Sequence, residues 1–188
     1  MRVELGPIIR GKEFKVMIDD GEEQLREGFL YPIIDINSIV LDIGSRYGSW
    51  TLTALRHGAT VYSFDFNPHY NQALLDNVLL NDGFIDRFHL ISSGVYSHEL
   101  TGPYYGFDNI TFTTIDKFSQ ERNVMPDFIR TDVRGSELMI LYGAQNTLKN
   151  RPKLFIKNYH GEAGEMALTK YLHHYQLISA KKGYCFFY

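Results

Sequence analysis

Three aspartates stand at or just after the ends of short hydrophobic runs, and these are the positions where chemistry is expected. Asp42 lies in the run 38–43, Asp65 closes the run 59–65, and Asp132 follows the run 127–131. If the runs are parallel strands, their carboxyl ends share one edge of a sheet, where open α/β sheets bind ligands. A carboxylate there can accept hydrogen bonds from a diol, pair with an ammonium group, or take a proton from a reacting hydroxyl.

A glycine loop follows the first of these runs. Its pattern is Asp42-x-Gly44-x-x-x-Gly48, and glycine lets the backbone turn tightly and come close to a ligand. The loop lacks the middle glycine of the G-x-G-x-x-G pattern, which packs amides against a dinucleotide pyrophosphate. S-adenosylmethionine has no pyrophosphate, so the spacing favours this methyl donor, with Asp42 serving its ammonium group or ordering water beside it. The loop candidates for cofactor binding are Asp42, Gly44, Ser45, Tyr47 and Gly48; on this motif alone, an ordinary strand–helix turn stays an open alternative.

The end of the second run strengthens the expectation of a nucleoside. An acidic residue about 20 positions after a glycine loop is placed to hold both ribose hydroxyls, and Asp65 fits this position. Phe66 could then flank the adenine. Ser92 and Ser93, at the end of the run 86–92, are expected at the adenine edge, although ordinary loop serines are an equally open interpretation of this pair.

The fourth strand end supplies candidates for the acceptor side. Asp132 is expected beside the methyl donor, and Glu137 lies on the helix after it; a carboxylate there could orient an acceptor hydroxyl or accept its proton. His160, after the run 153–158, could titrate near neutral pH. Structural alternatives are a helix N-cap for Asp132 and an exposed loop position for His160. The sequence shows no metal-ligand spacing, so it requires no metal.

The elements that must position these residues alternate between strands and helices. This alternation predicts an α/β fold with a parallel sheet covered by helices on both faces. A terminal hairpin adds an antiparallel strand, so the expected layout is the Rossmann-like, seven-stranded, mostly parallel sheet of class I methyltransferases. The seven strands are predicted at 38–43, 59–65, 86–92, 127–131, 153–158, 176–180 and 184–188, with a short extra strand at 109–115. Helices are predicted at 49–57, 68–81, 136–149 and 162–175, and a loop at 93–106.

One domain is expected over residues 38–188, with residues 1–37 as an N-terminal segment that packs on it. Within that segment, residues 22–29 are predicted to form a helix leaning over the cofactor pocket. A chain of 188 residues suits a single buried core.

The composition argues against several classes of protein. The net charge of −3 is unlike that of a protein built to hold a long polyanion. The single cysteine, Cys185, excludes an intrachain disulfide framework and favours a reducing compartment. No stretch approaches the roughly 20 apolar residues of a membrane span. Because no segment resembles a signal peptide either, a cytoplasmic location is expected.

From Ile39 to Tyr188 the chain resembles the FkbM family of S-adenosylmethionine-dependent methyltransferases. The resemblance rests on the segments IVLDIGSRYGSWTLTA, VYSFDFNPHYNQALLDNVLLND, FTTIDKF, PDFIRTDVRGSELMILYGAQNTL and KLFIKNY, which occur in that order before the closing hairpin. It implies O-methylation, often of a hydroxyl on a sugar, another small molecule or a glycan. It also implies cofactor roles for Asp42, Gly44, Gly48 and Asp65, and places Asp132 and Glu137 at the active site.

Two positions depart from the family's pattern. The family usually has Lys-Ile-Asp-Val-Glu-Gly in the fourth strand, where this chain reads Arg-Thr-Asp-Val-Arg-Gly over 130–135, so an acid becomes Arg134. The fifth strand commonly ends in Glu, and Lys157 stands near that place. Both changes invert the charge on the acceptor side. They make Lys157 a candidate site residue and bear on the acceptor more than on the reaction.

Two other functions suit the same fold. Ribose 2′-O-methyltransferases resemble this chain in having an Asp after strand four and a Lys after strand five, roles open to Asp132 and Lys157, with Lys12 or Lys15 as the earlier Lys. The late Glu of that group is missing because no Glu follows Glu165, and the acidic net charge also weighs against nucleic acid as the acceptor. In the other alternative, the fold binds S-adenosylmethionine without catalysis and serves as an interaction module.

Overall fold

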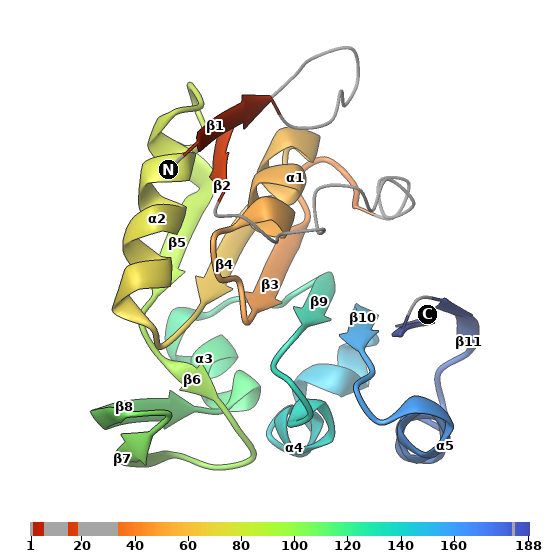
Figure 1. Cartoon of the computed structure of the whole chain (residues 1–188). Helices are drawn as coiled ribbons and strands as arrows, with labels where there is room; N and C mark the ends of the chain where they lie inside the picture. The colour runs from red at the N-terminus through yellow and green to blue at the C-terminus, as the bar shows by residue number, and fades with distance from the viewer. Residues whose placement is uncertain (1, 6–14, 19–33, 182) are drawn as a thin grey trace. The chain divides into compact units, whose positions relative to one another are not determined.

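The computed structural model describes residues 2–5, 15–18, 34–181 and 183–188 (Figure 1). The chain divides into two compact units, residues 1–92 and residues 93–188. Lys12 and the helix predicted over residues 22–29 lie outside the described residues. The boundary predicted at residue 38, between an N-terminal segment and one domain, stays a prediction.

The first unit is built on three parallel strands with β4 in the middle. These are β3 (Ile39–Ile43), β4 (Thr60–Phe64) and β5 (Phe88–Ile91). β3 is buried along nearly its whole length, as expected of an unbroken apolar run covered on both faces. A separate antiparallel pair, β1 (Arg2–Leu5) and β2 (Lys15–Ile18), also belongs to this unit.

Two helices connect these strands, and both begin where the sequence predicts. α1 (Ser49–His57) lies between Gly48 and Gly58, whose φ angles of 85° and 95° are readily adopted by glycine. α2 (Pro68–Leu79) begins with proline, and the Asn67 side chain caps it by accepting a hydrogen bond from the amide of His69 at 2.9 Å. A short 3₁₀ turn, η2 (Ile85–Arg87), precedes β5, so that strand starts two residues later than predicted.

The second unit contains β9 (Phe128–Thr131), β10 (Lys153–Lys157), β11 (Leu177–Lys181) and β12 (Tyr184–Phe187). β9 and β10 are parallel, whereas β12 pairs antiparallel with both β10 and β11. With β3, β4 and β5, these are the seven strands of the predicted layout. The predicted fold class, a mostly parallel α/β fold with a C-terminal antiparallel hairpin, is therefore confirmed.

The prediction of a loop over 93–106 is wrong. β6 (Gly94–Val95), β7 (Leu100–Tyr104) and β8 (Phe107–Thr113) form a small sheet in the order β6-β8-β7. β7 lies at its edge, where Pro103 is tolerated because an edge strand leaves one row of backbone groups without a ladder partner. Tyr105 and Gly106 make the two-residue hairpin turn, with φ angles of 49° and 84°.

The helices of the second unit differ from their predicted lengths. α3 (Ile115–Arg122) was not predicted, and its first residue had been assigned to a strand; Thr114 caps it by accepting from the amide of Lys117 at 3.0 Å. α4 (Glu137–Tyr142) is shorter than the helix predicted to reach residue 149, and a 3₁₀ turn, η3 (Thr147–Asn150), follows it. α5 (Gly161–Tyr171) agrees with prediction apart from its last turn.

Two contacts explain why α4 ends early. Gly143 packs so closely that a Cβ on it would lie 2.4 Å from the carbonyl oxygen of Tyr96. Further on, the Asp116 carboxylate accepts hydrogen bonds from the amides of Asn146 and Thr147, both at 2.8 Å. These amides are satisfied by a side chain from α3 instead of by helical carbonyls.

Candidate functional site

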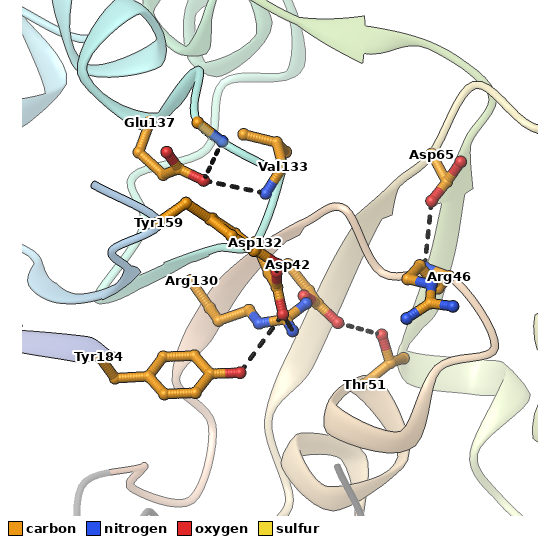
Figure 2. Close-up of polar contacts among 11 residues, drawn as sticks. Asp42, Arg46, Thr51, Asp65, Arg130, Asp132, Val133, Glu137, Tyr159 and Tyr184 are labelled. Carbon is orange, nitrogen blue, oxygen red and sulfur yellow. Dashed lines mark hydrogen bonds and ion pairs between the residues drawn. The ribbon is translucent and has the colours of Figure 1, made fainter. Parts of the chain in front are cut away.

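Asp42 is buried inside the end of the first unit's sheet. The Thr51 hydroxyl, on α1, donates to its carboxylate at 2.6 Å (Figure 2). The same hydroxyl oxygen lies 2.7 Å from the hydroxyl of Ser63 on β4. Since the one hydrogen of Thr51 is used by Asp42, Ser63 is the donor in this second contact. The chain Ser63–Thr51–Asp42 thus fixes the carboxylate against its neighbouring helix and strand.

The glycine loop is held by β4. The amides of Gly44 and Ser45 donate to the carbonyl of Phe64 at 2.9 and 3.1 Å, and the Ser45 hydroxyl lies 3.3 Å from the same oxygen. Gly44 and Gly48 have φ angles of 82° and 85°, in the left-handed region that other residues rarely adopt. A Cβ on Gly48 would also lie 2.0 Å from Leu74 Cδ1. The positive φ angles therefore account for glycine at both positions.

Tyr47, in the same loop, belongs to a half-buried aromatic cluster. Its ring meets the ring of Tyr70 edge to face, with 4.9 Å between centroids. The guanidinium of Arg46 lies 5.8 Å from the Tyr47 ring and 5.4 Å from the Tyr70 ring, within cation–π range. Asn77, on α2, donates to the Tyr47 carbonyl at 2.8 Å. These contacts anchor the loop to α2.

Asp65 stands directly after β4, and backbone amides hold both of its oxygens. The amide of Arg46 donates to Oδ2 at 3.1 Å, and that of Asn67 donates to Oδ1 at 2.9 Å (Figure 2). Each oxygen has two lone pairs, so each can accept one more hydrogen bond. Burial raises the pKa of Asp65, and the two amides partly oppose that rise. A vicinal diol donating to both oxygens would stabilise the ionised form.

The residues predicted to lie beside the adenine are divided between the two units. Phe66 is half-buried after Asp65, and Ser92 is exposed after β5. Asn71, on α2, bridges these two strand ends by donating to the carbonyl of Asp65 at 3.0 Å and to the Ser92 hydroxyl at 3.1 Å. Ser93 belongs to the second unit, where its hydroxyl contacts the carbonyl of Thr111 at 2.8 Å. Asn71 was not predicted as this link, because it lies within a helix and not at a strand end.

Asp132 stands directly after β9 and accepts hydrogen bonds from three side chains. Arg130 donates to Oδ2 in a 2.7 Å ion pair, and the Tyr184 hydroxyl lies 3.3 Å from the same oxygen. The Tyr159 hydroxyl donates to Oδ1 (Figure 2). A buried carboxylate is stable when it is paired and hydrogen-bonded in this way. Asp132 is therefore the centre of a polar cluster of four residues.

Glu137 shapes the turn between β9 and α4. Its Oε1 accepts from the amides of Val133 and Gly135 at 3.2 and 3.1 Å. Burial raises the pKa of Glu137, against the lowering effect of these amides. The turn itself has two consecutive residues with positive φ, Arg134 at 61° and Gly135 at 111°. Because its carboxylate accepts hydrogen bonds from backbone amides, Glu137 has an evident structural role. The catalytic role predicted for Glu137 stays a prediction.

Lys157 and His160 flank the end of β10 in different ways. The Lys157 ammonium lies 4.0 Å from the Tyr184 ring centroid, a cation–π contact beside the Asp132 cluster. His160 is exposed, and its Nε2 lies 3.1 Å from the carbonyl oxygen of Gly135. Since a carbonyl only accepts, Nε2 carries the hydrogen in this contact. His160 thus ties the β10 end to the turn that Glu137 shapes.

Three members of the Asp132 cluster were not among the predicted site residues. Arg130 belongs to the altered motif of the fourth strand, and no role was predicted for Tyr159 or Tyr184. The tyrosine after β10 was open to notice, because it follows a strand at its carboxyl end as the predicted aspartates do. Tyr184 gives no such signal, since it sits 52 residues from its partner.

Among the described residues, no group of three or more His, Cys, Asp or Glu side chains is arranged to hold a metal ion. Over the same part of the chain, every helix is too short or too polar to cross a membrane.

Comparison with known proteins gives a family match and a set of structural neighbours. The family model described as the methyltransferase FkbM domain matches residues 42–186. A crystal structure of methyltransferase FkbM from Methylobacillus flagellatus is 24% identical with a TM-score of 0.68, over 81% of this chain and 44% of that one. This chain thus spans less than half the length of that protein. A search of curated proteins found no match.

More distant neighbours share the fold. An rRNA methylase from Streptococcus thermophilus is 16% identical with a TM-score of 0.54, over 85% of this chain and 89% of that one. TrmK from M. capricolum, solved with S-adenosyl-homocysteine, is 15% identical with a TM-score of 0.51, over 85% of this chain and 64% of that one. At such identities, the likeness concerns the fold alone.

Proposed function

Because this chain belongs to the FkbM methyltransferase family, we propose that it transfers a methyl group from S-adenosylmethionine to a hydroxyl of a sugar, another small molecule or a glycan. The observation that carries the donor assignment is the Asp65 carboxylate. It is buried at the end of β4, held by two backbone amides, and retains acceptor capacity on both oxygens. A ribose diol has the two donors that this arrangement lacks.

The first unit suits the donor in other respects. S-adenosylmethionine carries a methyl group on a positively charged sulfur, and that group is what it supplies when bound. Asp42, which the Thr51 hydroxyl holds in place, is assigned to the ammonium of the methionyl part. The Gly44–Gly48 loop is assigned to contacts between the protein backbone and the donor. The adenine side is assigned to Tyr47, Phe66, Ser92 and Ser93.

The second unit is assigned to the acceptor. Methyl transfer to a hydroxyl needs the oxygen to be positioned and its proton to be removed. The Asp132 cluster provides a proton-accepting carboxylate, and the Lys157 ammonium provides a donor for another oxygen of a polyol. Because Nε2 of His160 donates to the Gly135 carbonyl, the nitrogen that His160 offers to a polyol hydroxyl is Nδ1, as an acceptor. In this proposal, Glu137 supports the site by fixing the turn after Asp132.

Calorimetric titration with S-adenosylmethionine tests the donor assignment. We expect saturable binding to one site. The absence of binding would rule out both methyltransferase interpretations of this chain, and it would also rule out the binding-module alternative.

Labelled methyl donor tests the acceptor class once binding is established. The protein is incubated separately with a panel of methyl glycosides and with RNA. Label on a glycoside is the expected result. Label found only on RNA would replace the acceptor with a ribose 2′-hydroxyl, and label on neither would favour a non-catalytic binding module.

A further inference from the structure

The Asp132 cluster reaches solvent through one of its four members. Arg130, Tyr184 and Asp132 are 1%, 3% and 7% exposed, whereas Tyr159 is 46% exposed. Asp132 is therefore largely shielded from solvent, and Tyr159 is the most exposed residue of the four. Among these residues, Tyr159 is the one that an acceptor molecule from solvent can most readily contact.

The hydrogen bonds of the cluster have a definite direction. Arg130 and Tyr184 both contact Oδ2 of Asp132, and Arg130 holds a fixed positive charge there. Oδ1 accepts from the Tyr159 hydroxyl. A phenol oxygen that donates its hydrogen keeps lone pairs with which to accept another. The Tyr159 oxygen can therefore accept from one partner while it donates to Asp132.

We propose that Tyr159 is a catalytic residue that passes the proton of an acceptor sugar hydroxyl to Asp132. This proposal rests on the proposed methyltransferase function and specifies how its acceptor side operates. The acceptor hydroxyl donates to the Tyr159 oxygen, and its proton moves there as the phenolic proton of Tyr159 moves to Oδ1 of Asp132. The acceptor oxygen takes the methyl group as the carbon–sulfur bond of the donor breaks, with both electrons remaining on sulfur.

The charges at the end of this proton transfer are compatible with the residues of the cluster. Tyr159 ends the step as a neutral phenol, Asp132 becomes a neutral acid, and the positive charge of the donor sulfur disappears. Burial and the Asp132 carboxylate both raise the pKa of Tyr159, so the phenol holds its proton at neutral pH and serves only as a carrier. The ion pair with Arg130 lies on Oδ2 of Asp132, so the proton from Tyr159 arrives at the other oxygen, Oδ1.

Tyr159→Phe removes the carrier and keeps the ring. The glycoside panel with labelled donor gives kcat and KM, and calorimetry gives the Kd for S-adenosylmethionine. We expect kcat to fall at least about 100-fold, the usual scale of general base catalysis, with Kd for the donor unchanged. The matched control is Tyr171→Phe, which removes a hydroxyl that donates to the Leu141 carbonyl at 3.1 Å and should keep the wild-type kcat.

Two more variants separate proton transfer from a merely structural role. Tyr184→Phe removes the phenol that contacts Oδ2 of Asp132 but keeps the hydrogen bond from Tyr159 to Oδ1. The kcat of Tyr184→Phe should therefore fall much less than that of Tyr159→Phe. Asp132→Asn should lose as much as Tyr159→Phe, and the double variant should lose no more than either, because both residues act in one step. If Asp132→Asn does not fold, the comparison of kcat between Tyr159→Phe and Tyr184→Phe distinguishes proton transfer from a structural role.

A spectroscopic measurement tests the contact itself. Tyrosine labelled isotopically at the ring carbon that bears the hydroxyl gives an NMR signal for Tyr159, assigned by its loss in Tyr159→Phe. Adding the best glycoside to the protein with S-adenosyl-homocysteine should shift this signal. The proposal is overturned by an unmoved signal, by a Tyr159→Phe kcat within threefold of wild type, or by a wild type that binds the donor but methylates no glycoside. Failure to bind the donor at all would instead mark failure of the proposed function.

Discussion

Asp65 and Asp132 both follow parallel strands, one in each unit, yet they are held in different ways. Backbone amides of the neighbouring loops donate to Asp65. Side chains of Arg130, Tyr159 and Tyr184 donate to Asp132. Any residue except proline supplies a backbone amide, so the Asp65 arrangement depends on the path of the chain. The Asp132 arrangement depends on the identity of three residues, which makes it the more easily broken by substitution.

The largest expected effect comes from removing the buried cation of the second unit. Arg130→Met leaves the Asp132 carboxylate buried without its ion-pair partner, and breaking a buried pair in this way costs about 3–5 kcal/mol. Urea denaturation gives the free energy of unfolding. Arg130→Lys keeps the positive charge and should lose clearly less. Equal stability of Arg130→Met and wild type would show that the side-chain donors of Asp132 do not depend on the cation.

The matching change in the first unit is Asp65→Ala, which tests whether the amide-held carboxylate binds the donor. Losing two hydrogen bonds to a charged acceptor should weaken S-adenosylmethionine binding by roughly 2–4 kcal/mol, or about 30- to 1,000-fold in Kd. Calorimetric titration measures the change. Asp82→Ala removes an exposed carboxylate from the same unit and should bind as wild type does. An unaltered Kd for Asp65→Ala would refute the ribose assignment.

The smallest effect concerns Glu137, which is amide-held like Asp65 but lies in the second unit. Burial raises its pKa above the ordinary 4.5, so the folded state holds this proton more tightly than the unfolded chain does. The stability from this group is present at low pH and is lost as pH rises from 4.5 through the raised value. Glu137→Gln keeps an oxygen acceptor for the amides of Val133 and Gly135 and cannot ionise.

The free energy of unfolding of Glu137→Gln should therefore fall less than that of wild type over the same rise in pH. Urea denaturation at a series of pH values measures both slopes. Glu162→Gln, at an exposed position of α5, serves as the control and should follow the wild-type slope. Parallel slopes for Glu137→Gln and wild type would contradict the role of burial.

Sequence reasoning succeeded where local signals agreed with the fold. Gly48 and Gly58 mark the ends of α1, and Asn67-Pro68 marks the start of α2, so both helices begin at the predicted residues. The carboxylates of the candidate site were also visible, because acidic residues at the ends of apolar runs are a one-dimensional pattern.

The misses arose where contacts between distant residues decide the structure. Tyr105-Gly106 forms a hairpin turn without the usual Asn or Asp, so β7 was not recognised. α4 ends at Tyr142, and the Asp116 carboxylate of α3 takes the amides of Asn146 and Thr147 beyond it, which no spacing within the helix reveals. In the same way, the phenols that donate to Asp132 come from residues 27 and 52 positions away.

These separations have a consequence for how the chain acquires its properties. The amides that hold Asp65 belong to residues 2 and 19 positions away, and short loops close at low entropic cost. Asp132 obtains its two phenols only when loops of 27 and 52 residues have closed, the second of them through the pairing of β12 with β10. Long-range pairings of this kind form slowly. We therefore expect the hydrogen bonds that hold Asp65 to form earlier along the folding path than the phenol hydrogen bonds to Asp132.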